Sequence, residues 1–392
     1  MICLQNCCEY ATRRLVDRKS EILYISTENM LPNKGGVCKA SSIPVGSVIE
    51  YKAGDVLISN IRPYFQKIWY ADKAGGCSAD VLCIRAKENT DSRYLYYLLS
   101  QQAFFDYIMS GAKGCKMPRG DKKQIMQWPV NLPPLAEQKR IAGILGALDD
   151  KIELNRRINA NLEEQIKALF KALFIDKQRD TDKNGVFNDI ILETLSGDWG
   201  QENTKGAFTS EVYCIRGVDI PDIQSGNKGR IPIRYILEKN LAKKKLSAND
   251  IVVEISGGSP TQSTGRVCLI TDSLLNRLGK DLICTNFCRA IKPIPEYAIF
   301  IYLYWQYLYD QNTMFSYENG TTGIKNLNIA DFLSKEPITI PDNKTVVAFN
   351  NIVSPLYNNI ILSGLESERL SSLRDTLLPK LMSGEINIEQ NS

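Results

Sequence analysis

The sequence predicts an α+β protein in which two similar mixed bodies are each followed by a long helix. Two observations lead to this fold class. Pro129 and Pro133 recur as Pro337 and Pro341, 208 positions later, within a weak internal repeat. Residues 135–174 also contain no proline and carry a helical apolar pattern. A chain of 392 residues is too long for one comfortable core, so we expect two main domains.

Composition narrows the function classes. Hydrophobic residues make up 44% and charged residues 23%, as in soluble globular proteins, and the most apolar window, residues 297–310, is too short to cross a bilayer. The first residues lack the charge order of a signal peptide, so a cytoplasmic location is expected, with the eleven cysteines mostly reduced and buried. Histidine is absent, which removes the commonest general base and metal ligand.

The repeat predicts the order of elements in each half. The segment "GAKGCK" at 111–116 corresponds to "GTTGIK" at 320–325, and "GDVLIS" at 54–59 corresponds to "NDIVVE" at 249–254. Strands are expected over 55–61 and 250–256, each followed by a helix, over 92–110 and 296–310. The offset changes within the bodies but holds at 208 from the prolines onward, so the long helices tolerate no change of length.

Apolar residues in the long helices recur at alternating spacings of three and four, which is the seam of a coiled coil. Both seams are polar at their midpoints, at Asn155 and Asn159 and at Ser363 and Ser367. Periodicity alone allows parallel or antiparallel packing; tandem copies favour antiparallel, with Asn155 level with Ser367 and Asn159 with Ser363. An ordinary pair of amphipathic helices in a larger core is the alternative. The residues expected at the seam or in subunit contacts are Glu137, Gln138, Ile141, Leu145, Leu148, Ile152, Leu162, Leu169, Phe349, Val353, Leu356, Ile360, Leu370 and Leu377.

Two bodies on a spacer of roughly 50 Å suit a ligand with two separated sites, and duplex DNA presents half-sites about one turn apart. The net charge of +4 permits such a partner. Basic clusters then become candidate phosphate contacts, against the alternative of a solvated surface. The candidate DNA-binding residues are Arg62, Lys67, Lys113, Lys116, Arg119, Lys122, Lys123, Lys239, Lys243, Lys244, Lys245 and Lys325.

Several segments resemble one known family. The stretch "LPPLAEQKRIAGILGALDDKIELNRRINANLEEQIKALFKALF" and "LRDTLLPKLMSGEI" near the C-terminus resemble the central and C-terminal repeats of the specificity subunit of type I restriction-modification systems. The segments "YISTENMLPNKGG", "GDVLISNIRPYF" and "GCSADVLCIR" are similar to parts of that family's target recognition domains. The likeness extends over nearly the whole chain.

The resemblance implies two pseudo-symmetric target recognition domains, over 1–131 and 179–339, separated by long antiparallel coiled-coil helices over 132–178 and 340–392. Each domain would bind one half of a bipartite site in double-stranded DNA. The helices would set the gap and dock two methyltransferase subunits, and restriction subunits would join for cleavage. The resemblance assigns no chemistry and no cofactor to this chain, and it places S-adenosylmethionine in the methyltransferase subunits.

Catalytic motifs give no competing assignment. The only Pro-Pro pair, Pro133-Pro134, lies before the long helix rather than in an adenine-methyltransferase loop, and neither a Gly-x-Gly-x-x-Gly nor a Walker A stretch is present. The rival function is a repeat scaffold that binds other proteins through its coiled coil. Salt dependence separates the two, because DNA binding weakens steeply as salt rises.

Overall fold

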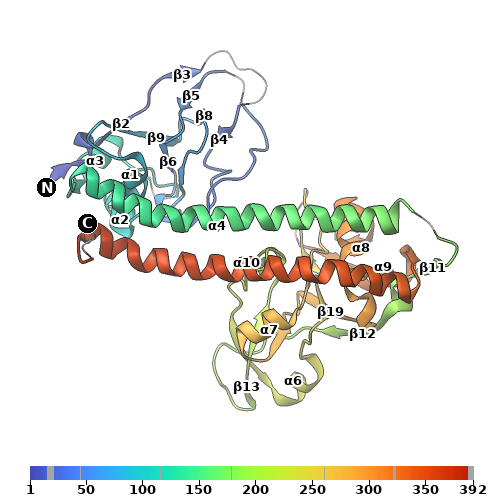
Figure 1. Cartoon of the computed structure of the whole chain (residues 1–392). Coiled ribbons are helices and arrows are strands. Elements are labelled where there is room, and N and C mark those ends of the chain that lie inside the picture. Colours follow the sequence, from blue (N-terminus) through green and yellow to red (C-terminus); the bar gives the residue numbers. More distant parts are fainter. Residues whose placement is uncertain are drawn as a thin grey trace, which may run out of the picture. The chain divides into compact units, whose positions relative to one another are not determined.

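The computed structural model describes residues 1–15, 22–44, 46–114, 116–177, 179–259, 261–320 and 324–386 (Figure 1). The chain forms two compact units: unit 1 comprises residues 1–151 and 370–392, and unit 2 comprises residues 152–369. The repeated Gly-Lys segments and the expected C-terminal segment are described only in part, because Cys115, residues 321–323 and residues 387–392 lie outside the described ranges. The predicted domain boundaries of the two helical segments stay a prediction, since each long helix contributes to both units.

Unit 1 is built on a four-stranded antiparallel sheet of order β2-β9-β6-β7. A second sheet has the order β3-β5-β8-β4, with β4 parallel to β8. Helices α1 and α2 pack with the first sheet around a core that includes Leu95, Phe104 and Phe105. The elements are β1 (Ile2–Cys3), β2 (Cys8–Tyr10), β3 (Arg14–Leu15), β4 (Tyr24–Ile25), β5 (Val48–Tyr51), β6 (Val56–Ser59), β7 (Ile68–Tyr70), β8 (Gly75–Cys77), β9 (Val81–Ala86), α1 (Ser92–Leu99), α2 (Gln102–Ser110), α3 (Lys122–Met126) and β10 (Pro129–Val130).

Unit 2 repeats this plan with the sheet β12-β19-β15-β17, again antiparallel, and a second sheet β14-β13-β18 in which β13 is parallel to β18. Its core is rich in aromatic residues of α8. The elements are β11 (Lys183–Val186), β12 (Ile191–Ser196), β13 (Phe208–Ile215), α5 (Ile220–Gln224), β14 (Ile233–Leu237), α6 (Glu238–Lys244), β15 (Ile251–Glu254), β16 (Ser256–Gly257), β17 (Val267–Leu269), α7 (Asp272–Leu278), β18 (Leu282–Cys284), β19 (Cys288–Pro293), α8 (Ala298–Asp310), β20 (Glu318–Asn319), β21 (Lys325–Leu327), α9 (Ile329–Lys335) and β22 (Pro337–Ile340).

The same buried ion pair occurs in both main sheets. In unit 1, Arg85 of β9 donates to both carboxylate oxygens of Asp55, at 2.8 and 2.7 Å. In unit 2, Lys292 of β19 donates to Asp250 at 2.9 Å. Both aspartates precede the central strand, and both accept a backbone N–H, from Lys52 and from Ser247. A pair kept at matching places in two sheets of the same strand order supports the internal repeat.

The helices differ from expectation in one place. The segment 92–110 is two helices, not one: α1 ends at Leu99, and α2 begins at Gln102. The hydroxyl of Ser100 bonds back to the carbonyl of Tyr96 at 2.6 Å, which satisfies one of the free carbonyls where α1 ends. The core helix expected over 296–310 forms as α8. Among the described residues, no helix is long and apolar enough to cross a membrane.

The two long helices begin directly after equivalent strands. Helix α4 (Leu135–Phe170) follows β10, which pairs with β1, and α10 (Asn343–Ser383) follows β22, which pairs with β11. Pro134 precedes α4, and Asp342 accepts the backbone N–H of Thr345 at 2.9 Å at the start of α10. A π-helical turn, Lys171–Ile175, extends α4.

The predicted seam faces inward. Every seam position named from the sequence is at least partly buried, whereas the adjacent apolar residues Leu154, Ile158 and Leu362 are exposed. Within unit 2 the helices are antiparallel, because Asn155 contacts Ser367, whereas Asn159, one turn later on α4, contacts Ile360, which lies earlier on α10. The amide of Asn155 donates to the Ser367 hydroxyl at 3.2 Å, as predicted. That of Asn159 donates instead to the Ile360 carbonyl at 3.0 Å, so its predicted pairing with Ser363 is wrong.

We expect the substitution Arg85→Met to lower the free energy of unfolding by about 3 kcal/mol, because it leaves the carboxylate of Asp55 buried without its cation. Chemical denaturation of the purified chain measures this loss. The matched control is Arg13→Met, since Arg13 pairs with Glu50 at an exposed position and should contribute little. Equal stability of both variants would contradict the assignment of Asp55–Arg85 as a buried anchor.

Candidate nucleic-acid interface

Three loops of unit 1 meet beyond the end of β6 and form one surface, made of residues 29–37, 60–67, 113–114 and 116–119, called here the loop surface. The backbone N–H of Asn33 donates to the carbonyl of Phe65 at 2.8 Å. That of Arg62 donates to the carbonyl of Pro118 at 2.9 Å. Backbone bonds therefore link the three loops to one another.

The loop surface concentrates backbone strain. Asn33, Lys34, Arg62 and Gln66 have φ values of 54°, 62°, 50° and 51°. Among the described residues, only two other non-glycine residues have positive φ. A left-handed conformation costs a residue with a side chain of the order of 1 kcal/mol, and it persists only where surrounding structure imposes it. Such strain gathers at binding and catalytic sites, which singles out this surface.

An exposed aromatic pair lies at the centre of the loop 60–67. Tyr64 and Phe65 are 49% and 38% exposed, and their ring centroids lie 4.7 Å apart. They sit in a 3-10 turn flanked by the strained Arg62 and Gln66. The ammonium of Lys67 lies 6.0 Å from the Phe65 ring and also donates to the carbonyl of Thr27 at 2.6 Å. Exposed rings beside cations are typical of surfaces that contact bases and phosphates.

The predicted cations of unit 1 divide into two groups. Lys116, Lys122 and Lys123 are exposed. Lys113 and Arg119 are also exposed, but they pair with Asp121 at 3.2 Å and Asp80 at 3.3 Å respectively. These exposed pairs are weak and can exchange an aspartate for a phosphate. The structure thus places Arg62, Lys67, Lys113 and Arg119 on the loop surface, with Lys116 in one of its loops and Lys122 and Lys123 beginning α3.

The predicted cations of unit 2 do not form one cluster. Lys239 and Lys243 are exposed on α6, but Lys244 donates to the carbonyl of Gly197 at 2.9 Å and Lys245 pairs with Asp281 at 2.6 Å. Lys325 lies apart from this run, on β21, where it pairs with the buried carboxylate of Glu318 at 2.8 Å. The run "KNLAKKK" therefore contains both exposed cations and cations that hold the fold.

One exposed aromatic residue of unit 2 was not predicted from the sequence. Phe287 is 55% exposed in the turn between β18 and β19, and its carbonyl accepts the N–H of Ile255 at 2.9 Å. In unit 1 the matching turn, between β8 and β9, carries Asp80, whose carbonyl accepts the N–H of Asn60. Phe287 thus marks the place of unit 2 that corresponds to the loop surface. No pattern in the sequence distinguishes it from a core residue.

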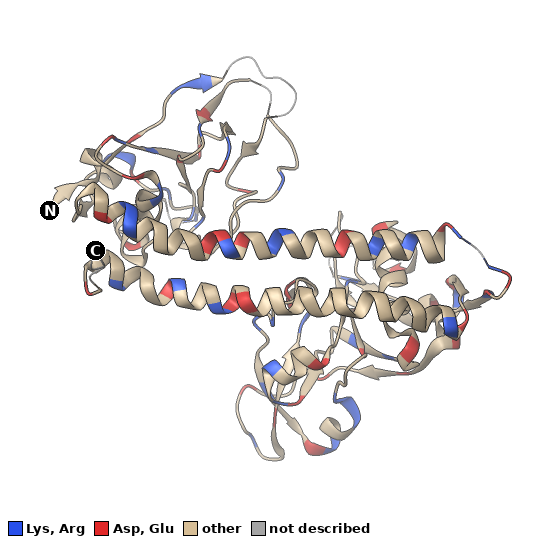
Figure 2. Cartoon of the chain, in the orientation of Figure 1, with Lys and Arg blue, Asp and Glu red and all other residues tan. Residues whose placement is uncertain are grey.

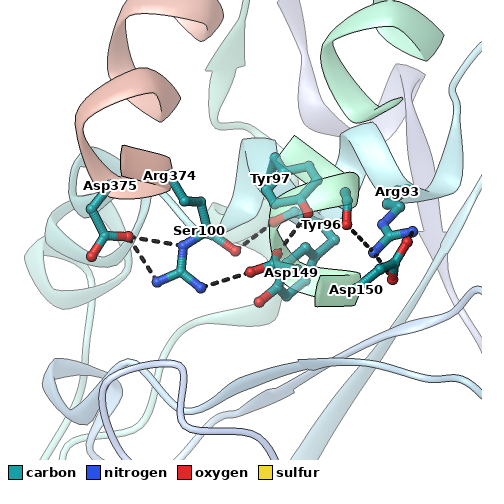
Figure 3. A network of polar contacts seen from close by, with 9 residues as sticks. Arg93, Tyr96, Tyr97, Ser100, Asp149, Asp150, Arg374 and Asp375 are labelled. Atoms are coloured by element: carbon teal, nitrogen blue, oxygen red, sulfur yellow. Dashed lines mark hydrogen bonds and ion pairs between the residues drawn. The ribbon is translucent and has the colours of Figure 1, made fainter. Parts of the chain in front are cut away.

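A polar network ties α1 to the parts of α4 and α10 that belong to unit 1 (Figure 3). Asp149 of α4 accepts the hydroxyl of Tyr97 at 2.6 Å and the guanidinium of Arg374, from α10, at 2.7 Å. Arg93 of α1 pairs with Asp150 at 2.6 Å. Burial lowers the pKa of Lys34, on the loop surface, and the nearby carboxylate of Asp375 opposes that change. The loop surface is therefore adjacent to this network within unit 1.

The side chain of Gln138, predicted to contact a partner subunit, is buried in unit 1. Its amide oxygen accepts the backbone N–H of Asp91 at 2.9 Å, and its amide nitrogen donates to the carbonyls of Asn89 and Pro133 at 3.1 and 2.9 Å. All of its polar atoms are therefore used in holding α4 against the turn before α1. Glu137 remains partly exposed.

The charges of α4 are balanced along the helix rather than gathered in a basic stripe (Figure 2). Glu153 bonds to Arg156 and Arg157, each at 2.7 Å. Among the described residues, no cluster of acidic or cysteine side chains could hold a metal ion. The described cysteines are free, and most are buried, as expected. Cations available to a polyanion are therefore supplied by the loops more than by this helix.

Comparison with known proteins finds one family model and several relatives. Residues 14–164 match the model of the type I restriction modification DNA specificity domain. Over these residues the chain is similar to that specificity domain. It is 25% identical to the HindI specificity subunit of Haemophilus influenzae over 93% of this chain and 94% of that one. It is 26% identical to the MjaIX specificity subunit of Methanocaldococcus jannaschii over 78% and 71% of the two chains.

A solved structure shares the fold. The S subunit of a type I restriction-modification system from M. genitalium superposes with a TM-score of 0.53 over 97% of this chain and 94% of that one, at 16% identity. The domain match, together with relatives that are named specificity subunits of type I restriction enzymes, bears out the resemblance seen in the sequence. It leaves the individual DNA-contacting residues as predictions.

We expect the double substitution Tyr64→Ser and Phe65→Ser to weaken specific DNA binding by about tenfold or more, because base stacking or apolar base contacts contribute about 1–3 kcal/mol each. The salt dependence of binding should stay unchanged. Lys116→Gln is the contrasting variant: it should reduce the slope of log affinity against log salt by roughly one. Fluorescence anisotropy of the assembled complex at several salt concentrations measures both. Loss of salt slope in the aromatic variant would contradict this division of roles.

Proposed function

We propose that this specificity subunit reads a bipartite DNA site, with one half bound by each recognition body and the gap set by α4 and α10. It directs adenine methylation by partner methyltransferase subunits, which hold S-adenosylmethionine, and restriction when restriction subunits join. The observation that carries the proposal is the repetition itself. Two bodies share one sheet order, and each leads directly into one of the two long helices.

The loop surface supports DNA reading by the first body. Its strained backbone presents rings and cations in a fixed arrangement, which lowers the entropy lost on binding. The second body carries Phe287 in the matching turn, with different neighbours and different ion pairs. Different side chains on equivalent turns fit the reading of two different half-sites, because base contacts rather than phosphate contacts specify sequence.

The helices support a fixed gap. Asn155 donates to the hydroxyl of Ser367 and to the carboxylate of Glu366, at 3.2 and 2.8 Å. A seam shifted by one helical turn would leave this buried amide without these partners, which is costly. Polar seam residues thereby select one register, as they do in coiled coils.

Exposed apolar residues on the helices are the preferred docking positions for partner subunits. Ile144 and Leu154 on α4 are 38% and 50% exposed, and the residues 208 positions later on α10, Ile352 and Leu362, are 55% and 59% exposed. The seam residues predicted to serve in subunit contacts are at least partly buried within the chain. Apolar side chains repeated at one offset suit two copies of the same partner, which fits a pair of methyltransferase subunits.

The decisive test of the function is methylation-sensitive long-read sequencing of a host that expresses this chain with its methyltransferase partner. We expect modified adenines in two short sequences separated by one gap. Insertion of four residues after Ala160 should change that gap and leave both half-sites intact, because it displaces part of α4 by about 6 Å. A continuous modified sequence, or an unchanged gap in the insertion variant, would contradict the proposal.

Docking is tested by stoichiometry. We expect Leu154→Asp to remove one of two methyltransferase subunits from the purified complex, and Leu154→Asp combined with Leu362→Asp to remove both, because a buried carboxylate opposes each apolar contact. Native mass spectrometry measures the subunit count. Leu192→Asp is the matched control, since Leu192 is 67% exposed on β12 and belongs to neither long helix. Two retained subunits in the double variant would place docking elsewhere.

A further inference from the structure

A loop of the second recognition body touches both long helices within unit 2. The loop, residues 225–228, follows α5. The carbonyl of Ser225 accepts the amide of Asn159 on α4 at 3.3 Å. The backbone N–H of Lys228 donates to Glu368 on α10 at 2.8 Å. The body therefore meets the helix pair through a short backbone segment as well as through its apolar core.

Two glycines bring the backbone of the loop close to that of α10. A Cβ atom added to Gly364 of α10 would lie 2.3 Å from the carbonyl oxygen of Gly226, and one added to Gly226 would lie 2.4 Å from the carbonyl oxygen of Ile360. Both clashes are with backbone atoms, which no side-chain rotation relieves. Gly226 also has φ of +81°, a conformation that favours glycine. Any larger residue at 364 must push the loop away from the helix.

Charged and polar groups close around this glycine contact. Arg277 of α7 donates to the carbonyl of Gly226 at 2.7 Å and pairs with Glu368 at 2.7 Å, and its side chain is only 10% exposed. Asn159 is 7% exposed and divides its amide between Ser225 of the loop and Ile360 of α10. One buried asparagine thus joins three parts: α4, α10 and the recognition body.

This arrangement explains why Asn159 departs from its predicted pairing with Ser363. A seam asparagine that only selected helix register would bond across the seam, as Asn155 does. Asn159 bonds partly outside the seam, to the body. The contact set Asn159, Gly226, Arg277, Gly364 and Glu368, called here the clamp, fixes the position of the loop 225–228 along and around the helices.

We propose that the clamp sets the orientation of the second recognition body on the helix pair and so determines which gap between half-sites the protein accepts. Its members are positioning residues that act through the body and not by touching DNA. The inference rests on the proposed function. Successive base pairs differ by about 3.4 Å in rise and about 35° in direction, so a body free to tilt reaches half-sites at more than one gap.

The test is the distribution of gaps methylated by Gly364→Ala, expressed with the methyltransferase partner and read by long-read sequencing. We expect both half-site sequences to persist while a second gap, one base pair longer or shorter, is methylated to at least a tenth of the level at the original gap. Glu368→Gln, which keeps an acceptor for Lys228 but weakens the pair with Arg277, should give the same second gap at a lower level. If the Gly364→Ala protein does not accumulate, the gaps methylated by Glu368→Gln test the clamp instead.

The matched control is Gly143→Ala on α4, where an added Cβ meets nothing within 4 Å. Alanine favours helix at both positions, so any difference between the two variants comes from the glycine contact. Methylation confined to the original gap in both Gly364→Ala and Glu368→Gln, or a changed half-site sequence, overturns the clamp. A wild-type chain that modifies a continuous site instead refutes the proposed function, which keeps the two failures distinct.

Discussion

The antiparallel packing of α10 against α4 in unit 2 is the constraint on which the rest depends. Apolar seam residues on both helices join the core of the second body, where the ring centroids of Phe170 and Phe349 lie 6.1 Å apart. Dispersion and burial stabilise this packing, but they allow α10 to slide along α4, because one apolar side chain can take the place of another at the seam. The polar contacts of Asn155 do not tolerate it. Burial therefore supplies the stability, and a few hydrogen bonds supply the register.

The two bodies have the same main sheet but differ in the loops beyond it. The sheets keep their strand order and their buried ion pair, Asp55–Arg85 or Asp250–Lys292. The loops beyond the sheets have diverged in charge, ring content and backbone conformation. Arg62 adopts a left-handed conformation beside exposed rings, whereas unit 2 uses Lys325 to neutralise Glu318. Changes in such loops cost the fold little, so the surface proposed to read DNA can vary while the sheet is retained.

Burial decides which residues of the long helices are accessible to a partner, and residue type alone does not. Gln138 and Asn159 are both polar residues in a long helix, and neither is free for an outside partner. Gln138 connects α4 to the turn before α1, and Asn159 connects α4 to α10 and to the loop 225–228. Leu154 and Leu362 are apolar yet exposed, because they precede the seam positions rather than occupying them. Exposure, not residue type, indicates which surface is open to another subunit.

The sequence by itself determined the features that follow from periodicity. The alternating spacing of three and four predicts both long helices and their inward faces, and the repeat at 208 predicts equivalent strands before them. These are local or regular patterns, and they need no knowledge of what lies nearby in space. The break between α1 and α2 was missed because the apolar pattern continues through it, from Leu99 to Phe104.

Tertiary structure alone decided which charges are free and which loops meet. Lys239 and Lys244 belong to one basic run, but only folding brings Gly197 and Asp198 to Lys244. The strain at Arg62 and Gln66, the exposure of Phe287 and the contact of Gly226 with Gly364 all arise between segments distant in the chain. Spacing along a sequence records the faces of helices and strands. It does not record the non-local approach of backbones, and that approach forms the candidate sites.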